Sequence, residues 1–276
     1  MTSIREVRAY WEKHPLYSFE VEGSKKGDPE YFKTIDRFKR ENIERFAFDY
    51  WAFKSFAGKE VLDDGCGPGW LTVNYAKSGA NVTAIDLTSQ AVRLTRQYLD
   101  LEGLSAKVYQ ASAEALPFPD NTFDLVVSSG VLHHTEDTLK AFLEAARVLR
   151  PGGEAKITLY HKGILHRPVI FPFVRFVMKA LSVRHPGADM ARNARSVDDF
   201  IRMYDGSDNP IGRGNTTNGW RHLLRKSGFR PYAWELHFFP KRFLPFHNLV
   251  PTFLHRWLDQ TMGTMIYFSC RKPARL

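Results

Sequence analysis

The stretch EVLDDGCGPGWLTVNYAKSGANVTAIDLT at residues 60–88 restricts the fold of this chain more than any other part of the sequence. It reads as a short apolar strand, a turn with three glycines in five residues, a helix, and a second strand that ends at an aspartate. Such a turn directs backbone N–H groups and the helix N-terminus into a crevice at the carboxyl edge of a sheet. Gly65, Gly67 and Gly69 would let a ligand approach the backbone closely. Asp86 would accept hydrogen bonds from ribose hydroxyls, so we expect the crevice to hold a nucleoside.

Strands and helices alternate along most of the remaining chain. Seven segments read as strands, at residues 60–63, 81–86, 106–111, 123–129, 154–161, 232–239 and 263–272. Helical segments lie between them, at residues 70–79, 89–103, 137–153 (with PGG as its stop), 219–229 and 251–260. Repeated strand–helix alternation favours parallel pairing with helices on both faces. We therefore predict an α/β fold with a doubly wound, mostly parallel seven-stranded sheet of the Rossmann-like type.

Two parts of the chain fall outside this alternation. Residues 1–58 are expected to be mainly helical, because apolar residues recur at helical intervals until Gly58 ends the run. Residues 163–218 contain an aromatic segment interrupted by Arg and Lys, and then the loop YDGSDNPIGRGN. We predict a helical cap at 1–58 and a main domain at 59–276 with a lid insertion at about 163–218. The lid would cover an apolar substrate, although its segment PVIFPFVRFVMKAL could instead lie on a membrane surface.

Composition restricts the environment of the protein. The two cysteines, Cys66 and Cys270, and an N-terminus without an apolar signal core favour a reducing, cytoplasmic location. No run of about eighteen apolar residues is present that could span a membrane. The cysteines and histidines lack metal-ligand spacing, so no metal is expected.

Charge is divided unevenly between the two halves of the chain. Residues 150–276 hold 21 Lys and Arg against 8 Asp and Glu, whereas residues 1–149 hold 18 against 22. The basic half can be explained by an anionic partner or by a solvated basic surface. Both interpretations stay open at this point.

Further motifs follow the glycine turn in a fixed order. ASAEALPFPDNTFDLVVSS begins after the third predicted strand, and GVLHHTEDTLKAFLEAARVLRPGGEAKIT follows the fourth. With VLDDGCGPG and AIDLT, they make the run from residue 61 to about 160 resemble the class I S-adenosylmethionine-dependent methyltransferases, of the small-molecule type grouped with ubiquinone-biosynthesis methyltransferases. Asp63 just before the glycines agrees with this, because an acid there suits a cationic amino group and would repel a dinucleotide pyrophosphate. The resemblance implies S-adenosylmethionine as cofactor and methyl transfer to O, N, S or C of a small molecule.

The resemblance also assigns cofactor contacts. It implies that Asp63 and the backbone of Gly65 and Gly67 hold the methionine amino end. It implies that Asp86 holds the ribose and that Leu87 packs on adenine. Further contacts, to the adenine edge and to the methionine part, fall on Ser112, Ala113, Glu114 and Ser129.

Other assignments concern the N-terminal segment and two departures from the family pattern. In similar proteins the N-terminal segment closes over the cofactor, which implies that Tyr31 and Arg37 lie near it. Family members usually have an apolar residue at Asp64, which we expect to face solvent or a basic neighbour. They usually have Asp at Ser112, where a hydroxyl accepts a bond from the adenine amine more weakly.

The chemistry requires few residues. Methyl transfer needs alignment and exclusion of water, and it needs a base only when the attacking atom carries a proton at neutral pH. His134 follows the fourth predicted strand at the crevice edge and is the candidate base. The alternative is that the HH pair positions the loop by hydrogen bonds, and His133 is expected to be structural.

Two other functions stay open on the same fold. The basic second half would suit an RNA-directed methyltransferase. We find no appended RNA-binding module and no Asn/Asp-Pro-Pro-aromatic motif where SSGVLHH stands, so no stable nucleic acid complex is expected. An enzyme that cyclises or cleaves S-adenosylmethionine is the other alternative. The sequence does not determine the acceptor or the oligomeric state.

Overall fold

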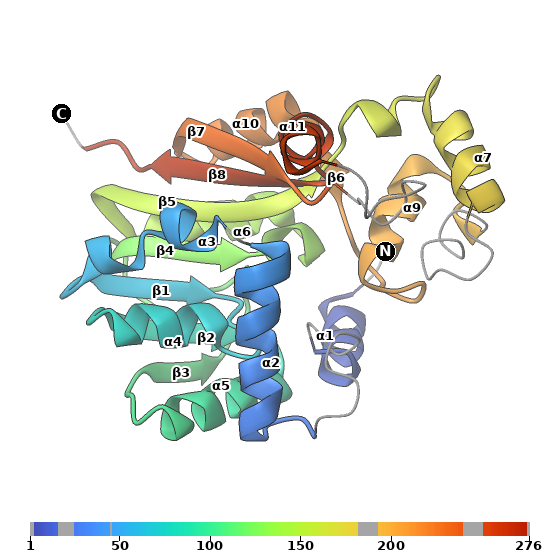
Figure 1. Cartoon of the computed structure of the whole chain (residues 1–276). Helices are drawn as coiled ribbons and strands as arrows, with labels where there is room; N and C mark the ends of the chain where they lie inside the picture. Colours follow the sequence, from blue (N-terminus) through green and yellow to red (C-terminus); the bar gives the residue numbers. More distant parts are fainter. Residues whose placement is uncertain (1–2, 16–24, 45, 182–192, 240–250, 275–276) are drawn as a thin grey trace.

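The computed structural model describes residues 3–15, 25–44, 46–181, 193–239 and 251–274. A sheet with the strand order β3-β2-β1-β4-β5-β8-β7 runs through its centre, and β6 pairs with β5 (Figure 1). The strands are β1 (Glu60–Asp64), β2 (Asn81–Asp86), β3 (Lys107–Gln110), β4 (Phe123–Ser129), β5 (Leu149–His161), β6 (Gly214–Asn215), β7 (Arg230–His237) and β8 (Met265–Arg271). β1 to β5 pair in parallel, whereas β8 is antiparallel to β5 and β7. The predicted doubly wound, mostly parallel sheet is confirmed, and the two-residue β6 is an additional strand.

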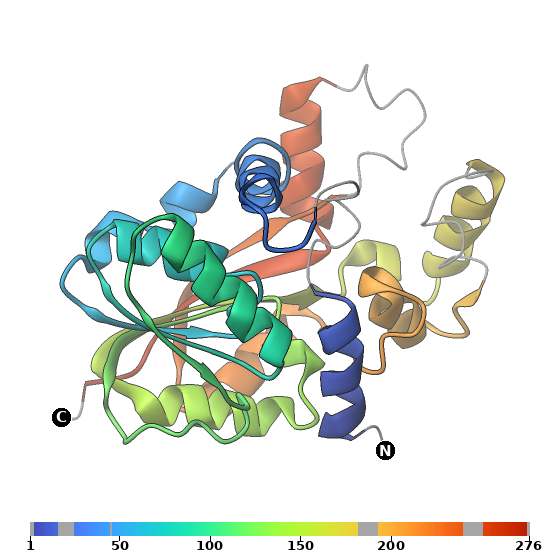
Figure 2. The ribbon, with the colours of Figure 1, turned by 90° about the horizontal axis from the view of Figure 1, so that it is seen from below.

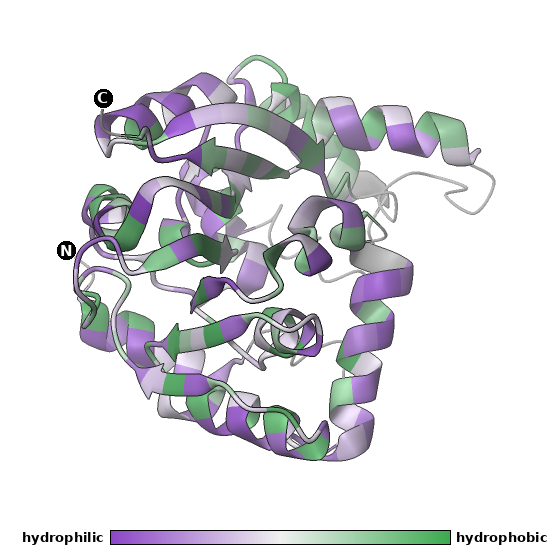
Figure 3. Ribbon diagram, turned by 90° about the vertical axis from the view of Figure 1, so that its left-hand side faces the viewer, coloured by the Kyte–Doolittle hydropathy of each residue, from purple (hydrophilic) through white to green (hydrophobic). Residues whose placement is uncertain are grey.

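Helices cover both faces of this sheet (Figure 2). One face packs against α4 (Trp70–Lys77) and α5 (Ser89–Leu101), and the other against α6 (Thr138–Val148) and α10 (Thr217–Lys226). Val61 belongs to the first core and Leu62 to the second, because successive side chains of a strand point to opposite faces. Strands buried on both faces read as continuous apolar runs. The helices instead carry mixed hydrophobic and hydrophilic residues along their length (Figure 3).

The connection between α6 and β5 differs from the prediction. The helix expected at residues 137–153 ends at Val148, and β5 begins at Leu149 and includes the PGG sequence. The ladder between β4 and β5 shifts register at this point. Gly153 fits the bulge because an added Cβ would lie 2.9 Å from the carbonyl oxygen of Arg150. PGG therefore starts the strand after the helix has already ended.

The described part of residues 1–58 consists of short helices, as expected. They are α1 (Ile4–Lys13), α2 (Pro29–Phe38), a π-helical turn (Lys39–Ile43), α3 (Ala47–Trp51) and a 3-10 turn (Phe53–Phe56). Figure 1 places α1 and α2 on the side to which the arrows of the parallel strands point. These two helices thus lie at the edge where the carboxyl ends of the strands meet. The boundary of a cap at residue 58 stays a prediction.

The segment predicted as a lid protrudes from the sheet beyond β5 (Figure 1). It contains a 3-10 turn (Ile164–His166), α7 (Phe171–Leu181), α9 (Val197–Arg202), a second 3-10 turn (Met203–Asp205) and β6, whereas α11 (Thr252–Met262) lies between β7 and β8. Phe171, Met178, Phe200 and Met203 form a small core of their own with Ala194. This core is separate from the two main ones, and the segment joins the sheet through β6, which pairs with β5. Its role as a lid stays a prediction.

A buried ion pair joins the N-terminal helices to the sheet. The Lys39 Nζ lies 3.1 Å from the Glu44 Oε1, and each side chain is only 3% exposed. Glu44 also accepts hydrogen bonds from the indole N–H of Trp51 and the hydroxyl of Tyr267 on β8. Removing one partner of such a pair leaves an uncompensated buried charge, which costs far more than the intact pair contributes.

We expect Glu44→Ala to lower the free energy of unfolding by about 3–5 kcal/mol, the cost of breaking a buried ion pair from one side. Urea denaturation followed by circular dichroism measures it. Asp49→Ala, at an exposed position of α3, is the control and should change stability by no more than about 0.5 kcal/mol. Equal effects of the two substitutions would contradict a structural role for the pair.

Candidate functional site

A cavity lies at the carboxyl ends of β1, β2 and β4 and is covered by α1. Nine of the residues predicted from the sequence line it, namely Gly65, Gly67, Asp86, Leu87, Ser112, Ala113, Glu114, Ser129 and His134. Four others do not, namely Asp63, Gly69, Tyr31 and Arg37. The sheet topology explains the gathering, because residues that end neighbouring parallel strands meet at one edge.

The three glycines of the turn all have positive φ, but they serve two different purposes. At Gly65 an added Cβ would lie 2.3 Å from the Cγ2 of Val131, and at Gly69 it would lie 3.0 Å from the Cα of Thr95. At Gly67 nothing lies within 4 Å of such a Cβ. Gly67 is thus the glycine that opens toward the cavity, whereas Gly65 and Gly69 permit packing within the protein.

Asp86 closes the turn and keeps room for a ligand. Its Oδ2 accepts from the backbone N–H of Gly67 at 3.0 Å, and its Oδ1 accepts from the N–H and the hydroxyl of Thr88. Burial raises the pKa of Asp86. A carboxylate oxygen has two lone pairs, so Oδ2 retains one acceptor position for a ribose hydroxyl.

Asp63 points to the α4 side of β1. Its Oδ2 accepts a 2.6 Å hydrogen bond from the hydroxyl of Thr72, and its Oδ1 is buried without a partner. Burial raises the pKa of Asp63 to about 6. The cofactor contact assigned to Asp63 stays a prediction, to be made through this unpartnered oxygen.

Asp64 is fully buried and lines the cavity, so the expectation that it faces solvent or a basic neighbour was wrong. β1 lies between β2 and β4 and has helices on both faces, which buries its side chains from Val61 to Asp64. Neither carboxyl oxygen of Asp64 has a hydrogen-bond partner. Burial, followed by repulsion from Asp63, raises the pKa of Asp64 to about 8. Asp64 therefore retains its proton near neutral pH.

The predicted N-terminal contacts are not where the sequence suggested. Tyr31 is buried in the main core with a hydroxyl that has no partner, and Arg37 is exposed on α2. Helix α1 lines the cavity instead, through Ile4, Val7 and Trp11. The N-terminal segment does cover the site, but with its first helix rather than its second.

Glu12, which sequence reasoning did not identify, fastens α1 over the cavity. Its carboxylate accepts from the backbone N–H groups of Ser89 and Gln90, both at 3.0 Å, and from the hydroxyl of Ser89 at 2.6 Å. These groups belong to the first turn of α5, where an anion satisfies free N–H donors and the helix dipole. A contact across 77 residues leaves no local pattern in the sequence.

The cavity is acidic. Asp64, Asp86, Glu114 and Glu136 line it, and its described lining contains neither Lys nor Arg. Together with the two unpartnered carboxyl oxygens of Asp64 and the open face of Gly67, this fits a nucleoside that carries positive charge. A dinucleotide pyrophosphate would meet carboxylates with no cation to balance it.

His134 lines the cavity, and only one of its two ring nitrogens forms a hydrogen bond. Its Nδ1 lies 2.5 Å from the carbonyl oxygen of Ile211, so this nitrogen carries the proton of the neutral ring. Its Nε2 is buried without a hydrogen-bond partner and lies 3.2 Å from the Oδ2 of Asp205. The ring of Trp11 covers the imidazole edge-on, with centroids 5.0 Å apart. The Nε2 lone pair therefore lies beside a carboxylate that would stabilise an imidazolium.

Asp205 was not identified from the sequence, and its signal was present only as part of the loop YDGSDNP. Its carboxylate accepts a hydrogen bond from the hydroxyl of Tyr160, and its backbone carbonyl accepts one from Tyr10. Helix α1, β5 and the insertion thus meet at this residue.

His133 differs from its neighbour. It is completely buried, neither ring nitrogen has a partner, and its ring lies against Tyr160 with centroids 4.0 Å apart. Burial, and next the proximity of His134, hold the pKa of His133 well below its ordinary value. A neutral histidine packed in this way agrees with the structural role predicted for it.

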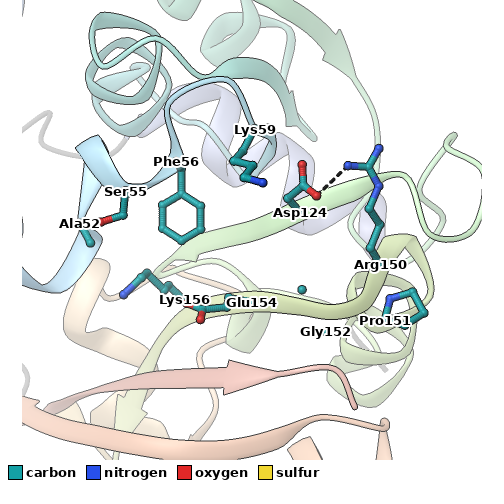
Figure 4. A pocket seen from close by; sticks show the side chains of 11 residues that line it. Ala52, Ser55, Phe56, Lys59, Asp124, Arg150, Pro151, Gly152, Glu154 and Lys156 are labelled. Carbon is teal, nitrogen blue, oxygen red and sulfur yellow. Dashed lines mark hydrogen bonds and ion pairs between the residues drawn. The ribbon is translucent and has the colours of Figure 1, made fainter. Parts of the chain in front are cut away.

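A second hollow lies at the opposite edge of the sheet, where the strands begin (Figure 4). Lys59, Asp124, Arg150 and Glu154 line it. Arg150 pairs with Asp124 at 2.7 Å, and Glu154 pairs with Arg271 at 2.8 Å. Arg150, Asp124 and Glu154 in this hollow thus already have charged partners. We therefore place the functional site at the carboxyl ends of the strands, where the unpartnered oxygens of Asp64 line a cavity.

The described residues contain neither a membrane-spanning helix nor a metal-binding cluster. No helix in this part of the chain is long and apolar enough to cross a bilayer. No three His, Cys, Asp or Glu side chains in the same ranges are grouped so as to hold a metal ion. Cys66 and Cys270 are both free and buried.

The fold and the acidic nucleoside cavity agree with the comparisons with known proteins. Residues 62–157 match the family model of the methyltransferase domain. The ubiquinone biosynthesis O-methyltransferase of Aromatoleum aromaticum is 38% identical over 99 residues, which is 36% of this chain and 42% of that protein. The malonyl-[acyl-carrier protein] O-methyltransferase of Erwinia billingiae is 37% identical over 110 residues, 40% of this chain and 42% of that protein. The aligned region spans less than half the length of these relatives.

Solved structures show the same fold over more of the chain. An S-adenosylmethionine-dependent methyltransferase from Mesorhizobium loti has a TM-score of 0.52 at 20% identity, covering 81% of this chain and 97% of that one. The [4+2]-cyclase SpnF has a TM-score of 0.53 at 19% identity, covering 82% and 80%. The chain thus shares with these structures the fold of a doubly wound, mostly parallel sheet with helices on both faces. With residues 62–157 it contains a class I S-adenosylmethionine-dependent methyltransferase domain, similar to those of ubiquinone-biosynthesis methyltransferases.

Substituting the turn glycines should separate folding from binding. Gly65→Ala should lower the free energy of unfolding by at least about 2 kcal/mol, because its Cβ meets Val131 and its φ is left-handed. Gly67→Ala should cost about 1 kcal/mol, from φ alone, yet weaken S-adenosylmethionine binding at least tenfold because its methyl group enters the cavity. Urea denaturation and titration calorimetry measure the two effects. Equal stability losses and an unchanged affinity for Gly67→Ala would contradict this division.

The buried Asp64 should make the ligand-free protein less stable as pH rises. Its pKa is about 8 in the folded protein, well above its ordinary value of 3.8, so the folded state binds the proton more tightly and loses this advantage between pH 4 and 8. We expect Asp64→Asn to gain stability relative to the wild type by at least about 1.4 kcal/mol on going from pH 5 to pH 9, one pKa unit. Denaturation of both proteins at both pH values measures this, and the cost of burying the amide cancels in the difference. A difference independent of pH would disprove the assignment.

Proposed function

We propose that this protein transfers a methyl group from S-adenosylmethionine to a small-molecule acceptor. The observation that carries the proposal is the acidic cavity at the glycine turn, with four Asp and Glu side chains and no Lys or Arg in its described lining. S-adenosylmethionine is the cofactor of this domain class and carries a sulfonium and an ammonium group. When bound, it supplies a methyl group that is already activated toward displacement.

The chain's residues divide the work of binding. Asp86 and Leu87 would hold the ribose and the adenine, while Ser112, Ala113 and Glu114 would line the adenine edge. The backbone of Gly67 and the oxygens of Asp63 and Asp64 would face the cationic methionine part. The Oγ of Ser112 already accepts from the N–H of Glu114 at 3.2 Å, so a hydrogen bond to adenine would use its second lone pair or its proton.

Exclusion of water would be the task of α1. Ile4, Val7 and Trp11 present an apolar face to the cavity, and Glu12 fixes the helix to α5. A dry, closed site strengthens the electrostatic interactions inside it and prevents hydrolysis. The main contribution expected of the protein is to align the acceptor between α1 and the carboxyl ends of the strands.

His134 would accept the proton of a hydroxyl or ammonium acceptor. Its Nε2 carries the lone pair, and the carboxylate of Asp205 at 3.2 Å would stabilise the imidazolium that forms. The relatives named above are O-methyltransferases, and the ubiquinone/menaquinone biosynthesis C-methyltransferase of Marinomonas sp. is 37% identical over 111 residues. The proposal therefore includes attack by oxygen and attack by carbon.

The basic charge of residues 150–276 suggests which kind of acceptor the protein binds. With 21 basic and 8 acidic residues there, we propose an anionic small molecule, methylated in the cytoplasm without a stable nucleic acid complex. The insertion at residues 163–218 would cover it. Cyclisation or cleavage of the cofactor is the less favoured alternative, because the relatives that match at 37–38% identity are named as methyltransferases.

Removal of the Asp86 carboxylate tests the cofactor assignment. We expect Asp86→Ala to weaken S-adenosylmethionine binding by about 1.5–3 kcal/mol, as for a hydrogen bond to a charged group. Titration calorimetry of wild type and variant measures it, with NAD as the control ligand. Unchanged affinity in the variant would remove the ribose assignment, and tighter binding of NAD than of S-adenosylmethionine would remove the proposed function.

Removal of the imidazole tests the base. His134→Ala should lower turnover of a hydroxyl or ammonium acceptor by about 10²–10⁴-fold while S-adenosylmethionine affinity changes little. Near-full turnover in the variant would mean that alignment alone suffices. Parallel loss of affinity and turnover would mean that His134 supports the cavity structurally.

A further inference from the structure

Helix α7 is apolar on two opposite faces. Phe171 and Met178 are buried in the small core of the insertion. On the other side Phe173 is 67% exposed and Phe176 is 68% exposed, and Val169, just before the helix, is 91% exposed. Packing within the insertion accounts for the apolar residues Phe171 and Met178, but it does not account for the exposed rings of Phe173 and Phe176.

Helix α11 presents a similar surface. None of its residues is buried. Phe253 is 77% exposed and Trp257, one turn further, is 56% exposed, so both rings lie on one side of the helix. The opposite side is held to the sheet, where Asp259 bonds to the imidazole of His237. Figure 2 shows α7 and α11 projecting on the same side of the molecule, away from α5 and α6.

The charge around these rings is positive. The segment 163–181 contains Arg167, Arg175 and Lys179 and no Asp or Glu. Arg256 lies beside Trp257 on α11 and is exposed. Aromatic rings flanked by Lys and Arg are the composition of helices that lie in the headgroup region of anionic membranes. Lys and Arg stems can cover apolar surface while their charges reach lipid phosphates.

We propose that the exposed faces of α7 and α11 dock on the surface of an anionic lipid bilayer. Both helices lie flat in the interface, since neither is long and apolar enough to span a bilayer. The aromatic side chains insert among the headgroups, and the cations provide attraction that falls with salt. This property is independent of the proposed methyl transfer and concerns where the protein resides.

Vesicle co-sedimentation of the full chain tests the proposal. Vesicles of phosphatidylcholine with a quarter phosphatidylglycerol should bind the wild type at least tenfold more tightly than phosphatidylcholine alone, and added salt should reduce the difference. Phe173→Ser with Phe176→Ser, and separately Phe253→Ser with Trp257→Ser, should each reduce binding at least tenfold. Leu143→Ser, at a 46% exposed position on α6, is the control and should bind as the wild type does.

Charge variants keep the test valid if the aromatic variants are poorly folded. Lys179→Glu with Arg256→Glu should weaken binding to anionic vesicles while melting followed by circular dichroism stays unchanged. Binding indifferent to lipid charge, or equal binding of wild type and aromatic variants, would overturn the proposal. So would dimers seen by light scattering that the aromatic substitutions abolish without any lipid effect, because the surface would then belong to a second copy of the chain.

Discussion

The hydrogen bonds between the glycine turn and the end of β2 determine where everything else in the site lies. The N–H groups of Gly65 and Cys66 both donate to the carbonyl of Ile85, at 2.9 and 2.8 Å, and the N–H of Gly67 donates to Asp86. These bonds fold the chain back at the strand end and start α4 in a fixed direction. The cavity, its acidic lining and the position of α1 above it follow from that geometry.

The sequence was sufficient for the parts that depend on local pattern. Strands buried on both faces are apolar throughout, and a glycine turn followed by an acid at the next strand end is a local arrangement, so the sheet and nine of the lining residues were predictable. Asp64 was misjudged because its burial comes from its place in the middle of the sheet. Glu12 and Asp205 were missed because each acts across a long stretch of chain, where neither periodicity nor spacing carries a signal.

The likeness to other proteins explains the cofactor side of the cavity better than the acceptor side. Residues 62–157 carry the family match and provide the cofactor side of the cavity. The residues that would meet an acceptor come from this region through His134, and from outside it through Trp11 of α1 and Asp205 of the insertion. The family match therefore covers only part of the acceptor side of the cavity.

The adjacent buried acids on β1 also bear on the direction of turnover. On the proposed reaction the cofactor enters with a sulfonium charge and leaves as a neutral thioether. Carboxyl groups that water cannot reach interact more strongly with the charged form, whose arrival favours their ionisation, than with the spent one. Asp63 and Asp64 would thus favour exchange of product for fresh cofactor, and each exchange would be accompanied by release of a proton from the protein interior. The pair would thus make the site prefer the charged cofactor over the neutral product. The cause is the same cost of burying carboxylate charge that makes the ligand-free protein less stable at high pH.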